Sequence, residues 1–384
     1  MNTMLDYQAR MKTFQQNLAQ QADLAFFPIS ADLAYLTGVP RDIPTFGWTI
    51  HPGHWLEGAW VTPNRAVLTL PRMSAEFGGL SDSADIELHV LGDHGNPADL
   101  VAKILKEMEL PNPPTVAIGD RAHGETVVNL QALLPNVRFI SGTDIVRKQR
   151  VIKTEEEIEV MRRAGAMTEA AFADVIPNLK HGMTELEVLT EVNYQLRKHG
   201  SLGESFPTAF YNSGVNHPLI FGKRLETMPR VLEPPVSILF DFGAILEDYC
   251  YDFGRTVFFG EPDANIQRVH GLVMASQAAG IAALKAGENT TAQADAAARK
   301  IIEDGGLGEA FRHRLGHGIG MDVHEPPFLT ASDHTLLQEG MLFTIEPSIT
   351  QFHDVSARVE DVVVARPGGG EPLTSGFQEL IVIE

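Results

Sequence analysis

Two acidic residues lie within stretches of sequence that are otherwise apolar enough to form buried strands. Asp241 lies in VSILFDFGA (236–244), and Asp252 follows eleven residues later in CYDFGRTVFF (250–259). The tight connection between them, GAILEDY, predicts that the two strands are neighbours. Neighbouring strands can aim both carboxylates at one point, and any fold that the chain adopts must accommodate this pair.

Three residues further along the chain extend this acidic set. Glu346 (in TIEPS) and Glu360 (in RVED) lie fourteen residues apart on consecutive predicted strands, and His317 lies in the Gly-rich segment HRLGHGIGMDVHE. Taken singly, each acidic residue is more often a cap, a strand-end residue or a paired structural carboxylate than a metal ligand. Four carboxylates and one imidazole crowded together would repel one another unless cations neutralise them. The set therefore predicts a two-metal site suited to Mn²⁺, Co²⁺, Fe²⁺ or Zn²⁺.

The chain divides into two regions with different patterns of elements. Residues 1–147 alternate between helix-like and strand-like runs, which predicts a small α/β domain. Residues 148–384 place helices in blocks among hairpin-like strands, which predicts an α+β domain. The charged passage 145–164 marks the boundary, and Thr154 and Glu157 within it form a capping-box signature that opens a helix.

The spacing of apolar residues predicts the individual elements. Helices are expected at 7–20, 31–38, 97–109, 124–134, 263–285 and 291–304. Strands are expected at 23–29, 86–92, 115–120, 137–140, 236–244, 250–259, 341–349, 358–366 and 380–384, with a hairpin at 59–70.

Composition argues against several classes of protein. The 50 acidic residues outnumber the 30 basic ones, which disfavours a protein that binds nucleic acid or an anionic membrane through a basic face. A single cysteine, Cys250, cannot form an intrachain disulfide. The polar N-terminus lacks the apolar core of a signal peptide, and no run of 18 apolar residues occurs, so we expect a cytoplasmic protein without a membrane span.

Several motifs resemble those of the pita-bread metallopeptidase family. FDFGAILEDYCYDFGRT, HRLGHGIGMDVHE, TIEP and RVED occur in the order found in that family, and AYLTG (34–38) and RVIKTEEEIEVMRRA (150–164) resemble its prolidase, aminopeptidase P and creatinase branch. The resemblance covers most of the chain. It implies a creatinase-like N-terminal domain, a pita-bread catalytic domain over residues 148–384, and a homodimer.

The resemblance also implies a role for each member of the acidic and histidine set. Asp241 would chelate one metal and His317 the other, while Asp252 and Glu360 would bridge both. Glu346 would bind the second metal and act as the base for a bridging water, which as hydroxide would be the nucleophile.

Three further residues near these motifs match family positions. His313 and His324 would line the substrate pocket and stabilise developing charge or the leaving group, and Arg358 would orient the nearby acidic groups. The alternative is two structural histidines with satisfied hydrogen bonds and a surface arginine.

Two positions depart from the prolidase pattern. Phe221 stands where a histidine usually handles protons at the scissile amide, although His217 lies four residues earlier. Phe328 stands where an arginine usually grips the dipeptide carboxylate. Both changes remove polar groups from the substrate pocket, so His217 or His324 would have to substitute for the missing histidine.

All three tryptophans, Trp48, Trp55 and Trp60, fall within residues 47–60. Such aromatic clusters mostly reflect packing. In creatinase-like proteins, however, the N-terminal domain of one subunit closes over the site of its partner, so Trp55 is also a candidate for contact with the substrate.

We therefore expect a dinuclear metallohydrolase that cleaves a small peptide in the manner of an Xaa-Pro dipeptidase or aminopeptidase. Two alternatives remain within enzymes: a creatinase-like or ectoine-hydrolase-like C–N hydrolase, and a lyase acting on dimethylsulfoniopropionate. A catalytically silent binding protein on the same fold is a third. Silent relatives typically lose metal ligands, whereas all five are present here.

Overall fold

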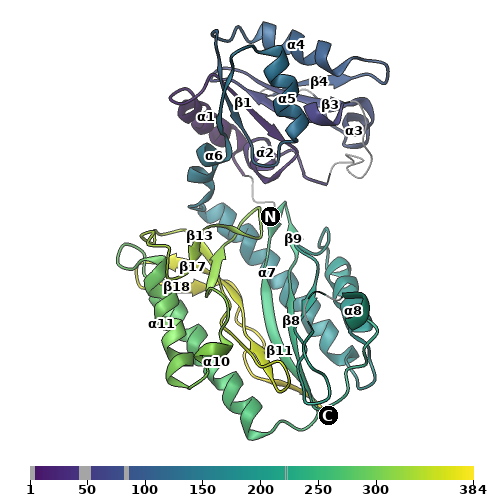
Figure 1. The fold of residues 1–384 in the computed structure, drawn as a ribbon, viewed down its shortest axis with the longest axis vertical. Coiled ribbons are helices and arrows are strands. Elements are labelled where there is room, and N and C mark those ends of the chain that lie inside the picture. Colours follow the sequence, from purple (N-terminus) through teal and green to yellow (C-terminus); the bar gives the residue numbers. More distant parts are fainter. Residues whose placement is uncertain (1–4, 43–52, 82–85, 221, 223) are drawn as a thin grey trace. The chain divides into compact units, whose positions relative to one another are not determined.

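The computed structural model describes residues 5–42, 53–81, 86–220, 222 and 224–384, and it contains two compact units (Figure 1). The chain passes from the N-terminal unit to the C-terminal unit between Arg150 and Val151. Both units combine helices with sheets, which confirms the α+β class expected from the sequence. No helix within the described ranges is long and apolar enough to cross a lipid bilayer.

The N-terminal unit is built on one six-stranded sheet with the strand order β4-β3-β2-β1-β5-β6. The β1–β2 and β2–β3 pairs are antiparallel, and the other three pairs are parallel. The strands are β1 (Leu24–Pro28), β2 (Gly58–Val61), β3 (Ala66–Pro71), β4 (Glu87–Leu91), β5 (Thr115–Ile118) and β6 (Arg138–Ser141). The helices are α1 (Tyr7–Leu18), α2 (Ala31–Thr37), η1 (His54–Leu56), α3 (Arg72–Phe77), α4 (Pro97–Glu107), α5 (Gly124–Leu133) and α6 (Thr143–Arg150).

Two of the three tryptophans pack inside this unit. Trp60 is fully buried, and its ring lies 4.3 Å from that of Phe26 in β1. Trp55 is 4% exposed within the same core, and its backbone carbonyl accepts a hydrogen bond from Thr126. Trp48 lies outside the described residues. The structure therefore places the ring of Trp55, a candidate for substrate contact, in the core of its own unit.

The C-terminal unit holds the remaining elements. Its helices are α7 (Glu155–Val175), η2 (Ile176–Asn178), α8 (Glu185–Lys198), α9 (Arg224–Thr227), α10 (Ala264–Ala283), α11 (Thr291–Asp304) and η3 (Gly308–Ala310). Its strands are β7 (Ala209–Phe210), β8 (Val236–Phe242), β9 (Ile245–Leu246), β10 (Tyr249–Cys250), β11 (Phe253–Phe259), β12 (Gly316–Gly318), β13 (Glu325–Leu329), β14 (Leu342–Ile345), β15 (Ser348–Thr350), β16 (Ser356–Arg358), β17 (Asp361–Arg366), β18 (Gly369–Pro372) and β19 (Ile381–Ile383).

Two sheets form the centre of this unit, with helices on their outer sides (Figure 1). The sheet β19-β11-β8-β7 packs against α7, where the Phe172 ring contacts Phe240 and Phe253. The sheet β13-β12-β14-β17-β18 shares a buried apolar cluster with α10 and α11. The sheets meet where Gly254 in β11 exchanges two backbone hydrogen bonds with Glu360. This junction brings the acidic strands of both sheets together.

Three strands that the sequence predicts as continuous are interrupted, and each interruption falls at a candidate metal ligand. The stretch 250–259 divides into β10 and β11 around Asp252, the stretch 341–349 divides into β14 and β15 at Glu346, and the stretch 358–366 divides into β16 and β17 before Asp361, at Glu360. Pro347 has no backbone N–H to donate to a neighbouring strand, which explains the second interruption. At these points the backbone leaves one ladder for another, and the acidic side chains lie at the junctions.

Candidate metal centre

Asp241 and Asp252 lie at the ends of two antiparallel strands. Asp241 is the penultimate residue of β8 and lies opposite Gly254 of β11, two residues after Asp252. A Cβ atom at Gly254 would lie 2.9 Å from the Cβ of Glu360 and 3.0 Å from one of its carboxylate oxygens. The glycine therefore leaves the space that Glu360 needs to approach the two aspartates.

His317 lies on β12 with one ring nitrogen directed at the carboxylates. Its Nε2 is 3.6 Å from Asp252 Oδ2 and 3.5 Å from Glu346 Oε1. Its Nδ1 lies 3.0 Å from the carbonyl oxygen of Gly318, which can only accept a hydrogen bond, so Nδ1 carries the proton and Nε2 keeps its lone pair. Burial lowers the pKa of His317 to about 3, so the ring is neutral, as a metal ligand must be.

Several buried carboxylate oxygens at this centre have no hydrogen-bond partner among the described residues: Asp252 Oδ1 and both oxygens of Glu360. Burial, and next the charges of neighbouring carboxylates, raise the pKa of Asp252 and of Glu360 well above the ordinary range. Ligand atoms of Asp252, His317 and Glu360 all lie within 4.8 Å of one another. Buried, unpaired oxygens beside one neutral imidazole form a donor set that fits a divalent cation.

Arg358 is buried among these carboxylates, so it is not a surface arginine. Its Nη1 lies 2.6 Å from Asp241 Oδ2 and 3.5 Å from an oxygen of Glu346 and of Glu360. Its Nε donates to Ser348 Oγ at 2.7 Å, which fixes the orientation of the guanidinium. Burial raises the pKa of Asp241 to about 6, although the charge of Arg358 opposes this rise.

A second arginine, Arg255, supports the backbone beneath the centre and was not singled out from the sequence. It is fully buried and donates five hydrogen bonds, to the carbonyl oxygens of Gly254, Glu360 and Gly376 and to Asp361. The signal available in the sequence was a charged residue inside the apolar strand FGRTVFF and an aspartate directly after Glu360. Arg255 thus connects the two strands that carry Asp252 and Glu360.

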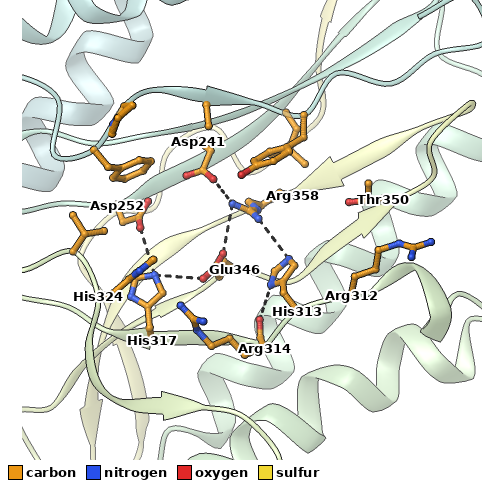
Figure 2. A pocket seen from close by; sticks show the side chains of 16 residues that line it. Asp241, Asp252, Arg312, His313, Arg314, His317, His324, Glu346, Thr350 and Arg358 are labelled. Carbon is orange, nitrogen blue, oxygen red and sulfur yellow. Dashed lines mark hydrogen bonds and ion pairs between the residues drawn. The ribbon is translucent and has the colours of Figure 1, made fainter. Parts of the chain in front are cut away.

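A cavity of about 610 Å³ opens beside the centre (Figure 2). Asp241, Asp252, His317 and Glu346 form part of its lining, together with two histidines, three arginines and an apolar wall. The remaining lining residues are Phe206, Pro207, Ala209, Tyr211, Leu239, Arg312, His313, Arg314, Val323, His324, Thr350 and Arg358.

His313 and His324 both lie in this cavity. The His324 ring packs edge-on against His317 at 4.1 Å, and His313 Nε2 lies 3.5 Å from Arg358 Nη2. Burial, and next the charge of Arg358, lower the pKa of His313 to about 4, and burial also lowers the pKa of His324. Both rings are therefore neutral near pH 7 and can donate one hydrogen bond and accept another.

Other residues proposed from the sequence lie elsewhere. His217 is 3% exposed, its Nε2 lies 2.9 Å from Glu185 Oε1, and it does not line the cavity. Phe328 lies opposite His317 across the β12–β13 pair, below the guanidinium of Arg314. Phe221 lies outside the described residues. His217 and His324 are the two candidates to replace the histidine that prolidases usually have. The structure places His324 in the cavity and His217 against Glu185.

Comparisons with known proteins agree with this geometry. Residues 159–367 match the model of metallopeptidase family M24. An Xaa-Pro dipeptidase from Lactobacillus delbrueckii subsp. lactis is 37% identical over 269 residues, which cover 68% of this chain and 71% of that protein. A dipeptidase structure from Pyrococcus horikoshii OT3 superposes with a TM-score of 0.84 at 26% identity, over 97% of this chain and all of the other. The X-Pro aminopeptidase of Thermotoga maritima MSB8 superposes with a TM-score of 0.81 at 27% identity, over 96% of this chain and all of the other.

Proposed function

The chain belongs to metallopeptidase family M24, and from this membership we propose that it is a dinuclear enzyme that hydrolyses the amide bond of Xaa-Pro dipeptides. The family makes it a metal-dependent hydrolase with the pita-bread fold. The observation that carries the proposal is the convergence of four carboxylates and His317 at the edge of a cavity, where three buried oxygens have no hydrogen-bond partner among the described residues.

The five ligands would be divided between two cations of the Mn²⁺, Co²⁺, Fe²⁺ or Zn²⁺ type. Asp252 and Glu360 suit the shared positions because they have buried oxygens without a hydrogen-bond partner among the described residues, whereas Asp241 and His317 suit one cation each. Bound cations would supply Lewis-acid activation of water and of the substrate carbonyl. Arg358 would then orient Asp241 and Glu346 and limit the repulsion among the carboxylates.

The side chains of the cavity would handle the protons and the substrate. Glu346 lines the cavity and would accept a proton from the attacking water and return it to the leaving nitrogen. Neutral His324 would donate a hydrogen bond to the carbonyl oxygen or accept one from the substrate amine. His313 donates from Nδ1 to the carbonyl oxygen of Arg314, so its Nε2 would act only as an acceptor, for the substrate amine. The apolar wall that includes Phe206 and Tyr211 would contact the proline ring and exclude water.

The proposal is tested with purified protein loaded with Mn²⁺ and a panel of small substrates. We expect release of proline from Leu-Pro, and a loss of at least about a thousandfold in kcat for Glu346→Gln, because the base is removed while the amide keeps its shape. Glu339→Gln, at an exposed glutamate of the same unit, is the matched control and should retain full activity. Turnover of creatine or ectoine in place of dipeptides would overturn the peptidase assignment.

The same proposal includes a homodimer, a cytoplasmic location and a creatinase-like domain over residues 1–147. These points rest on the resemblance to prolidases. Light scattering on the purified protein measures its oligomeric state directly.

A further inference from the structure

The cavity has positively charged side chains that are not paired with its acidic groups. Three arginines line it, and Arg358 alone among them pairs with carboxylates. Within the described part of the chain, no carboxylate lies within ion-pair distance of Arg312 or Arg314. Figure 2 likewise shows no interaction drawn to either of these guanidinium groups. Once cations neutralise the ligand carboxylates, both arginines face the cavity as free positive charges.

The two free arginines differ in their surroundings. Arg312 is exposed and lies 4.8 Å above the Phe352 ring. Arg314 is half-buried and lies 5.0 Å above the Phe328 ring, and its Nε is buried without a partner among the described residues. A buried donor without a partner is costly, so this nitrogen is suited to an acceptor that arrives with a ligand.

Arg314 is also close to the reacting centre. It lies three residues before His317, and its charge adds to burial in lowering the pKa of His324. The Phe328 ring supports one face of the guanidinium, which leaves the edge free to form paired hydrogen bonds.

The number of free charges points to the class of substrate. A neutral Xaa-Pro dipeptide has one terminal carboxylate, whereas the cavity offers two unpaired guanidinium groups. We propose that Arg314 binds a second carboxylate, carried by the side chain of the N-terminal residue, so that the enzyme prefers acidic Xaa-Pro dipeptides. This inference rests on the proposed function and names its substrate class.

The test compares Glu-Pro with Gln-Pro, which have nearly the same shape and differ in charge, on the Mn²⁺-loaded enzyme, with Leu-Pro as the neutral reference. We expect kcat/KM for Glu-Pro to exceed that for Gln-Pro by about tenfold or more, mostly through KM, because a site built for a charged group discriminates strongly against its neutral analogue. The preference should shrink as salt is added.

Substitutions then assign the preference to one residue. In Arg314→Met, whose side chain can still pack on Phe328, the Glu-Pro to Gln-Pro ratio should fall to about one, whereas Arg314→Lys should keep part of it. Arg268→Met, at an exposed arginine of α10, should leave the ratio unchanged. Circular dichroism and Mn²⁺ binding establish that each variant is folded.

Three results would overturn the inference, and they are distinguishable. Turnover of Leu-Pro and Gln-Pro without any preference for Glu-Pro would refute the role of Arg314 and leave the peptidase assignment intact. Absence of turnover with all three dipeptides would refute the proposed function and the inference together. A preference for Glu-Pro that persists in Arg314→Met would also refute the role of Arg314.

Discussion

Replacing Arg255 with methionine should destabilise the C-terminal unit far more than a typical substitution. Methionine has a similar length and is apolar, so it fills most of the space but donates no hydrogen bond. The change removes five hydrogen bonds and leaves the carboxylate of Asp361 buried without its cation. It also leaves the carbonyl oxygens of Glu360 and Gly376 without these donors.

The magnitude follows from the burial of the pair. Arg255 and Asp361 are each 1% exposed at the side chain, so water cannot replace the lost contacts. Removing one partner of a buried ion pair costs about 3–5 kcal/mol. Asp361 keeps hydrogen bonds from Gln277, Thr374 and Gln378, which favours the lower part of that range.

The assay is urea unfolding followed by far-ultraviolet circular dichroism. All three tryptophans precede residue 61, so tryptophan fluorescence reports on the N-terminal unit and serves as an internal reference. Arg268→Met is the matched control and should cost less than about 1 kcal/mol, because its guanidinium is exposed and its two hydrogen bonds, to the Gly305 carbonyl oxygen and to Asn265 Oδ1, are at the surface.

A double-mutant cycle with Asp361→Asn completes the experiment. The two single changes should not add, and the coupling should be at least about 1 kcal/mol, because each single variant already removes the ion pair between Arg255 and Asp361. A cost below about 1 kcal/mol for Arg255→Met, or strict additivity in the cycle, would refute the argument that this buried pair supports the backbone of Glu360.

Three further perturbations have expected outcomes. The pKa of His270 is lowered by burial, and next by the charge of Arg255, to about 4 from an ordinary value of 6.5. As the pH falls, the unfolded chain therefore binds this proton before the folded chain does, and the free energy of unfolding should decrease between pH 6.5 and pH 4 by up to about 3 kcal/mol. In a series of urea melts at different pH, His270→Leu should flatten this decrease. A profile that is unchanged in the variant would refute the role of His270. Lys153→Met should lower Tm by several degrees in calorimetry, because the buried carboxylate of Glu325, 3.1 Å from Lys153 Nζ, would lose its cation. A matching loss in the exposed Lys300→Met would contradict this reasoning. Mn²⁺ at a hundred times its Kd should stabilise the protein by about 2.7 kcal/mol, which thermal melts measure as a rise in Tm that EDTA reverses. Glu360→Gln should abolish most of this rise. An equal rise in the variant would place the metal elsewhere.

Local sequence signals were sufficient for many of the elements. The capping box of Thr154 and Glu157 opens α7 as expected, because its hydrogen bonds involve only residues three positions apart. The left-handed residue Gly38 ends α2 for the same local reason, with a φ of 73°. Periodicity likewise located the helix Thr291–Asp304 at its exact bounds.

The parts that the sequence did not predict depend on distant residues. The runs around Asp252 and Glu360 have a continuous apolar pattern, yet both strands are interrupted because the backbone there changes partners between sheets. The support from Arg255 depends on Asp361, 106 residues further along the chain. The sequence places His217 only four residues before Phe221, which favours it for the pocket, but the orientation of its side chain is determined by Glu185 on α8.

The backbone pairing of Gly254 with Glu360 has a consequence for how the protein folds. These residues are 106 positions apart (360 − 254), so the pairing that brings the candidate ligands together closes a long loop. Contacts of such large sequence separation form slowly, because the entropy of the intervening chain is lost before the contact contributes. A cation that needs ligands from both sheets finds no site until this closure is complete. Metal should therefore act on the folded molecule by slowing its unfolding, and it should leave the rate of folding nearly unchanged.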